Sequence, residues 1–83
     1  MSENYQYPLS LSWTPEEMAI VIAFLNQVEN YYEAKVDEKK FLLAYQAFKK
    51  VVPSIGQEKQ LDREFEQVSG YSSYQAIKGV RSK

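Results

Sequence analysis

The sequence predicts an all-α protein: a small bundle of four helices, two long and two shorter, that follows an extended N-terminal arm. Apolar residues recur every three to four positions in four consecutive segments, which is the period of an amphipathic helix. Hydroxyl or acidic side chains stand directly before these segments, where helix N-caps are found. Strict alternation occurs only in the arm, so no second strand is present to pair with it.

Residues 1–13 are expected to form the extended arm. In YQYPLSLSW, apolar and polar side chains alternate, and Pro8 cannot donate a hydrogen bond to a neighbouring strand. Such a segment fits an arm lying over the helices better than a strand. The side expected to be buried carries Tyr5, Tyr7, Leu9, Leu11 and Trp13.

The first helix is predicted over about residues 15–34. Thr14 is placed as its N-cap, Pro15 at its first position, and Glu17 where it completes a capping box. Two apolar stripes run side by side along it: Met18, Val21, Ile22, Leu25, Val28 and Tyr32 in one, Ile20, Phe24 and Tyr31 in the other. An apolar arc this wide is typical of a central helix covered on more than one side.

The second helix is predicted over about residues 38–52. Asp37 is its expected N-cap, and Pro53 ends it, because proline offers no N–H and restricts the residue before it. Leu42 and Leu43 lie off its main apolar stripe and need cover from elsewhere.

The third and fourth helices are predicted over about residues 55–68 and 73–80. Ser54 and Ser72 are their expected N-caps, and Gly70 is expected to end the third helix in the left-handed conformation. The stretch SGYSSY therefore has the chemistry of one helix ending and another beginning. Charged residues cover most of the third helix, which predicts a peripheral position for it.

The composition describes one folded domain, residues 1–83, with 45% hydrophobic and 25% charged residues. No secretion signal is recognisable, and no segment approaches the length of a membrane span. We therefore expect a cytoplasmic protein that does not insert into a membrane.

The residue types present argue against most kinds of catalysis. The chain has no cysteine and no histidine, which removes thiol chemistry, the commonest general base and the commonest metal ligand. SGYSSY lacks the glycine-rich pattern with a lysine that binds nucleotides. The acids at helical i, i+4 spacing, Glu58 with Asp62 and Glu29 with Glu33, are expected to be solvated surface groups. We expect no enzyme activity and no cofactor.

Seven of the aromatic residues are tyrosines, and two interpretations of them stay open. They could pack at core edges with hydrogen-bonded hydroxyls, or form an exposed cluster that binds a partner. Tyr31 and Tyr32 point about 100° apart on an ideal helix and are not expected to share one face. The candidate partner-binding residues are Tyr31, Leu42, Leu43, Tyr71, Tyr74 and Lys78.

The net charge of −1 gives no strong electrostatic footprint for nucleic acid. Its distribution is uneven, since residues 1–34 contain five acids and no base, whereas residues 71–83 contain three bases and no acid. Contact between the first helix and later basic segments would explain this. A basic tail that meets an acidic partner is the alternative.

Three stretches, YPLSLSWTPEEM, AYQAFKKVVPS and EKQLDREFEQVSGYSSYQAIK, resemble the uncharacterised protein family 0223, a set of short bacterial proteins of unknown function. The resemblance spans about residues 5–78, and its most specific parts are VPS at 52–54, EFEQVSGYS at 64–72 and Trp13. One departure is Ile55-Gly56, where the family favours a lysine and a small residue. The resemblance implies a compact all-α cytoplasmic protein with no assigned activity, cofactor or catalytic residue.

We therefore expect a non-catalytic protein–protein interaction module with an unknown protein partner. The alternative is a weak nucleic-acid or ribonucleoprotein accessory protein. A homodimer is expected if the bundle leaves the second stripe of the first helix uncovered, because a two-fold contact is the commonest way to bury such a surface. In the competing interpretation, a chain this short uses every apolar residue internally.

Overall fold

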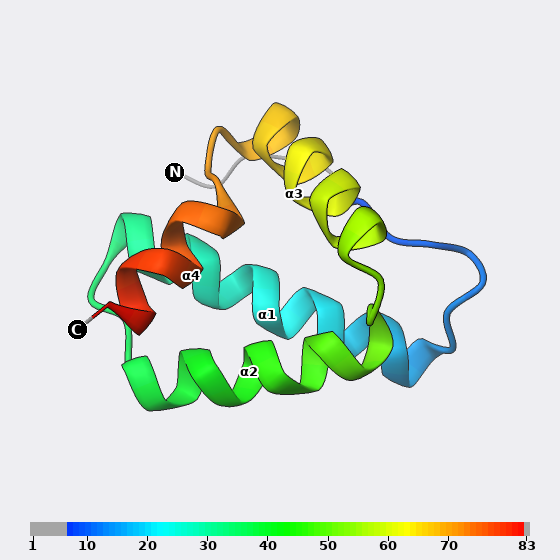
Figure 1. Ribbon diagram of the computed structural model, residues 1–83, viewed down its shortest axis with the longest axis horizontal. Coiled ribbons are helices and arrows are strands. Elements are labelled where there is room, and N and C mark those ends of the chain that lie inside the picture. The colour runs from blue at the N-terminus through cyan, green and yellow to red at the C-terminus, as the bar shows by residue number, and fades with distance from the viewer. Residues whose placement is uncertain (1–6, 83) are drawn as a thin grey trace.

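The all-α fold is confirmed in the computed structural model, which describes residues 7–82 (Figure 1). The helices are α1 (Pro15–Glu33), α2 (Glu38–Val51), α3 (Ile55–Ser69) and α4 (Ser73–Arg81). Every helix starts at its predicted residue and ends within one residue of its predicted end. The sequence predicts α3 as one of the shorter helices, but its 15 residues exceed the 14 of α2. No helix in the described part of the chain is long and apolar enough to cross a membrane.

The helix ends are set by the local signals present in the sequence. At α1 the Thr14 hydroxyl accepts from the Glu17 N–H at 3.1 Å, and the Glu17 carboxylate accepts from the Thr14 N–H at 2.9 Å. These two bonds complete the predicted capping box. The hydroxyls of Ser54 and Ser72 cap α3 and α4. Gly70 ends α3 with φ of +82°, a left-handed conformation that favours glycine.

The core is centred on the contact between α1 and α2, which lie antiparallel, with α4 packed against both (Figure 1). The Phe24 ring of α1 has its centroid 5.7 Å from that of Phe41 and 4.6 Å from that of Phe48 on α2. All three rings are buried. The other buried apolar side chains are Trp13, Val21, Leu25, Val28, Val52, Leu61, Phe65, Ala76, Ile77 and Val80.

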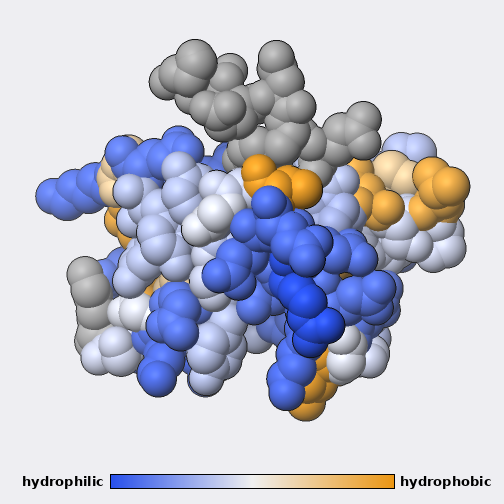
Figure 2. All heavy atoms as spheres, turned by 90° about the horizontal axis from the view of Figure 1, so that it is seen from above, coloured by the Kyte–Doolittle hydropathy of each residue, from blue (hydrophilic) through white to orange (hydrophobic). Residues whose placement is uncertain are grey.

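Helix α3 is peripheral, as its charged faces predict. Among the helices its backbone comes close only to that of α4 (Figure 1). Leu61 and Phe65 are buried beneath it, whereas Ile55 and Val68 near its two ends are 67% and 43% exposed. Figure 2, which looks down on the side of the molecule where α3 lies, shows a mainly hydrophilic face with separate hydrophobic spots.

The arm joins α3 to α1. The Tyr7 hydroxyl donates to Asn26 and Glu29 of α1, at 3.0 Å in both cases. The centroid of its ring lies 6.0 Å from that of the Phe65 ring on α3. Trp13 is buried, as expected for the residue at the junction of arm and helix. Tyr5, which the sequence predicts on the same buried side, lies outside the described residues.

The expectation that Leu11 is buried with the rest of the arm is wrong, because its side chain is 96% exposed. The cause is a turn in which the Trp13 N–H donates to the Ser10 carbonyl at 3.2 Å. The Ser12 N–H donates to the Ser10 hydroxyl at 3.2 Å as well. The alternation of sides therefore stops at Ser10, and Leu11 stands at the tip of the turn.

Candidate partner-binding groove

A groove of about 680 Å³ opens between α2, α3 and α4. It exists because α3 approaches α4 but not α2, so side chains alone span the space between α3 and the C-terminal half of α2. Its apolar part contains the buried Ile77 of α4, the half-buried Tyr45 of α2, and two exposed side chains. These are Ile55 at the start of α3 and Tyr74 at the start of α4, which are 67% and 59% exposed.

At one end of the groove, Glu58 joins α3 to α2. One carboxylate oxygen accepts from the Tyr45 hydroxyl at 3.1 Å, and the other accepts from the Lys49 ammonium. Burial raises the pKa of Tyr45, with a further contribution from the neighbouring Glu58 carboxylate, while Arg81 acts in the opposite direction. The positive charge of Arg81 on α4 therefore lies close enough to Tyr45 to lower the pKa of its hydroxyl.

At the other end, Asp62 joins α3 to the start of α4. One carboxylate oxygen accepts from the Ser73 N–H at 2.8 Å, the Ser73 hydroxyl at 2.6 Å and the Tyr74 N–H at 3.3 Å. A carboxylate at this position satisfies N–H groups that have no partner within the helix, and it complements the helix dipole. Asp62 and Ser72 together fix the first turn of α4.

The expectation that the paired acids are solvated surface groups holds for Glu33, which is exposed, and is wrong for Glu29, Glu58 and Asp62, which are half-buried. Glu58 and Asp62 bind neighbouring helices, as described above, and the two acids of α1 also accept hydrogen bonds from other segments. Glu29 accepts from Tyr7 at 3.0 Å, and Glu33 accepts from Tyr71 at 2.6 Å. Because all of the donors except the Lys49 ammonium are uncharged hydroxyls or backbone N–H groups, counting charges along the chain could not find most of these contacts.

Three cations of the groove have no acidic partner in the described part of the chain. Lys59 and Arg63 of α3 and Arg81 of α4 line the groove, and none of them lies within ion-pair distance of a described carboxylate. Their side chains belong to exposed residues. They can therefore meet the negative groups of another molecule.

A second feature is a cluster of tyrosines that joins the end of α1 to the turn between α3 and α4. The Tyr32 and Tyr71 rings stack with centroids 4.9 Å apart, and the Tyr31 ring meets Tyr32 edge to face at 5.1 Å. The expectation that Tyr31 and Tyr32 cannot share a face is therefore wrong, because their long side chains bend toward each other. The Tyr32 hydroxyl donates to the Ser72 carbonyl at 2.9 Å, and burial raises the pKa of Tyr32.

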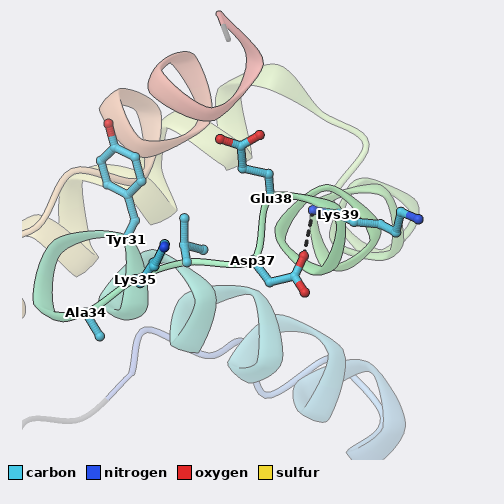
Figure 3. A pocket seen from close by; sticks show the side chains of 7 residues that line it. Tyr31, Ala34, Lys35, Asp37, Glu38 and Lys39 are labelled. Carbon is cyan, nitrogen blue, oxygen red and sulfur yellow. Dashed lines mark hydrogen bonds between the residues drawn. The ribbon is translucent and has the colours of Figure 1, made fainter.

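Tyr31 is held against α4 by a close approach to Gly79. A Cβ placed on Gly79 would lie 2.0 Å from the Tyr31 hydroxyl oxygen. In Figure 3 the Tyr31 ring points toward α4, above a hollow of about 510 Å³ that Lys35, Asp37 and Lys39 also line. The Asp37 side chain in this view accepts from the Lys39 N–H and so belongs to the N-cap of α2.

The structure does not bring the six candidate residues together in one surface. Tyr74 lines the groove, whereas Tyr31 and Tyr71 belong to the tyrosine cluster. Leu42 is half-buried against the core, Leu43 is 59% exposed on α2, and Lys78 is exposed on α4 outside the groove.

The groove residues that sequence reasoning missed include Ile55, Asp62 and Arg81. A signal for Ile55 was present, because it precedes Leu61 by six positions and so falls off the stripe that Leu61 and Phe65 form. Asp62 and Arg81 have no such signal, since their positions depend on how α3 and α4 pack. Among residues 7–82, no group of three or more acidic, histidine or cysteine side chains is placed to hold a metal ion.

Comparison with known proteins identifies the family. The model of the uncharacterised protein family UPF0223 matches residues 4–83. A UPF0223 protein of Lactococcus lactis subsp. cremoris (strain MG1363) is 61% identical over 82 residues, which cover 99% of this chain and 88% of the relative. Proteins of the same description from Streptococcus sanguinis (strain SK36) and Streptococcus pneumoniae (strain CGSP14) are 58% and 54% identical over 83 residues, each covering 90% of the relative. The chain belongs to the uncharacterised protein family UPF0223.

Proposed function

We propose that this protein is a non-catalytic interaction module of the bacterial cytoplasm, and that the groove between α2, α3 and α4 binds its protein partner. The observation that carries the proposal is the exposure of Ile55 and Tyr74 beside the apolar floor formed by Ile77. Exposed apolar side chains grouped around a concave surface are a common feature of partner sites. Aromatic residues at such sites often contribute most of the binding energy.

The polar contacts of the groove support a non-catalytic role. Glu58 uses both carboxylate oxygens to hold Tyr45 and Lys49, and Asp62 caps α4. A general base must be free to reach the proton of a bound substrate. These two acids instead hold the walls of the groove in place.

A nucleic-acid accessory role is the second candidate function. The observation in its favour is the presence of four cations in the groove, namely Lys49, Lys59, Arg63 and Arg81. Against it, three acids line the same groove and would repel a phosphate backbone. We therefore rank it second.

The test is a quantitative comparison of the proteins that three forms of the full chain retain from a bacterial extract. The groove variant is Ile55→Ser with Tyr74→Ser, and both side chains are exposed, so we expect its fold to be unchanged. The control is Leu43→Ser, which removes an apolar side chain that is also 59% exposed but lies on α2 outside the groove.

We expect partners that the wild type and Leu43→Ser retain equally and that the groove variant loses. Equal retention by all three forms, with circular dichroism confirming that each is folded, would place the partner site elsewhere. Partners that disappear after nuclease treatment would favour the nucleic-acid role instead.

A further inference from the structure

We propose that the occupant of this groove is a protein segment that combines a large apolar side chain with carboxylates. The apolar side chain enters between Ile55, Tyr74 and Ile77, and the carboxylates meet Arg81 and Lys59. This inference rests on the proposed function and specifies the chemistry of the partner. It follows from which charges of the groove remain uncompensated and from where they lie.

The charge balance of the groove is positive. Four cations line it, namely Lys49, Lys59, Arg63 and Arg81, against three acids, Glu58, Asp62 and Glu66. Among the described residues Lys49 is paired with Glu58, whereas Lys59, Arg63 and Arg81 have no acidic partner within ion-pair distance. The groove therefore attracts negative groups although the net charge of the whole chain is −1.

The two ends of the groove differ in charge. Lys49, Lys59 and Arg81 stand against one acid, Glu58, at the end where Tyr45 lies, whereas Arg63 stands against Asp62 and Glu66 at the other end. Asp62 binds the first turn of α4, and both Asp62 and Glu66 raise the pKa of Tyr32, which donates to the Ser72 carbonyl at this end. Arg81 lies at the opposite end of α4. Negative groups of a partner are therefore expected at the Arg81 end.

The apolar side chains favour an occupant with an apolar group over one that is merely anionic. Ile55 lies one helical turn before Lys59, so an apolar surface borders the positive end of the groove. Tyr74 continues this surface along the first turn of α4. An occupant without an apolar group would leave both side chains in water, whereas a peptide with one would bury them together.

The experiment selects peptides from a randomised display library on the immobilised full chain and then measures the affinity of the most enriched peptide by fluorescence anisotropy. We expect enrichment of aspartate or glutamate close to a large apolar residue. Arg81→Glu should weaken binding about tenfold or more, because it places a carboxylate where the peptide carboxylate binds. Lys78→Glu is the matched control, since it makes the same charge change on an exposed residue of the same helix outside the groove.

The outcomes separate this inference from the proposed function. Enriched peptides that are neutral or basic, and that the Ile55→Ser and Tyr74→Ser variant fails to bind, would overturn the inference and leave the function in place. No enrichment on the wild type over the Ile55→Ser and Tyr74→Ser variant would overturn both. Equal weakening by Arg81→Glu and Lys78→Glu would show a general charge effect and overturn the assignment of Arg81.

A labelled single-stranded RNA tests the other class of partner in the same assay. We expect it to bind more weakly than the selected peptide, because Asp62 and Glu66 oppose phosphates along the groove. RNA that binds more tightly than the peptide and depends on Arg81 would replace the acidic segment as the occupant.

Discussion

Tyrosine hydroxyls bound to carboxylates recur at the joints of this protein. Tyr7, Tyr45 and Tyr71 donate to Glu29, Glu58 and Glu33 respectively. In each pair the two residues belong to different segments, so one hydrogen bond links two parts of the fold. A tyrosine suits this position because its ring packs on apolar neighbours while its hydroxyl reaches a charged acceptor, which makes the hydrogen bond stronger than a neutral one.

The first prediction concerns Tyr7→Phe. The substitution keeps the ring against Phe65 but removes the hydroxyl that donates hydrogen bonds to Asn26 and Glu29. We therefore expect the free energy of unfolding to fall by about 1 kcal/mol. Urea titrations at neutral pH measure this difference. Tyr74→Phe is the control, because its side chain is 59% exposed, and we expect no loss there.

The difference in the free energy of unfolding between wild type and Tyr7→Phe should depend on pH. Burial, together with the Glu29 carboxylate, raises the pKa of Tyr7 from 10.0 to about 12, so the folded protein favours the protonated hydroxyl. This contribution is fully present below pH 10.0 and is lost as the pH rises toward about 12. The stability difference between wild type and Tyr7→Phe should therefore shrink over this interval. A difference that stays constant up to pH 12 would contradict the assignment.

The second prediction concerns Gly79, which lies inside α4. Alanine normally stabilises a helix interior by about 1 kcal/mol relative to glycine. At Gly79 the new Cβ would meet the Tyr31 hydroxyl at 2.0 Å, so we expect Gly79→Ala to destabilise the protein by about 1–3 kcal/mol. Gly56→Ala is the matched control, since its Cβ meets only the Ser54 hydroxyl at 3.8 Å, and it should be neutral or stabilising.

A double variant checks the cause of this loss. Tyr31→Leu removes the ring that the new methyl group would meet, so Gly79→Ala should cost less in that background than in the wild type. Equal costs in the two backgrounds, measured by thermal unfolding, would show that the close approach of Tyr31 does not require glycine.

At the scale of the elements, Asp62 links α3 to α4. Asp62→Ala leaves the N–H groups of Ser73 and Tyr74 without their acceptor, and we expect a loss of about 1–3 kcal/mol. Amide hydrogen exchange should become faster in the first turn of α4. Glu64→Ala should change neither quantity, because Glu64 is an exposed acid two positions further along α3 whose hydrogen bond is to Gln60 of the same helix.

The helices were predictable because their signals are local. Thr14, Ser54 and Ser72 stand where N-caps belong, and Gly70 ends α3 in the conformation that glycine favours. The position of Leu11 was not predictable from alternation, because a single turn at Ser10 reverses the chain.

The groove was also beyond sequence reasoning. Its shape depends on α3 approaching α4 and not α2. The separation of α3 from α2 is set by side chains that meet across the three helices. Of the residues proposed from the sequence, Tyr74 lies there because α4 begins beside Asp62. Periodicity identifies the apolar face of one helix, but it does not state which neighbour covers that face.

At the scale of the whole molecule, the structure leaves less apolar surface for self-association than the sequence predicts. The second apolar stripe of α1 is largely covered within one chain, since Phe24 is 1% exposed and Ile20 and Tyr31 are half-buried. We therefore expect a single monomer mass in sedimentation equilibrium across a hundredfold concentration range. A concentration-dependent dimer mass would point to the remaining exposed apolar side chains, Leu43 among them, as its contact.

The last prediction concerns how α3 is held in the bundle. Its backbone comes close to no helix except α4, and the Tyr7 ring of the arm lies against Phe65, which is completely buried. Deleting residues 1–12 would expose Phe65 and remove the half-buried Leu9, at a cost of at least about 2 kcal/mol. For a domain of this size the midpoint of thermal unfolding should fall by roughly 10 °C, and amide exchange should accelerate more in α3 than in α1. Leu11→Ser should leave both measurements unchanged, because that side chain is already 96% exposed. If the deletion left the midpoint unchanged as well, α4 alone would suffice to hold α3 in place.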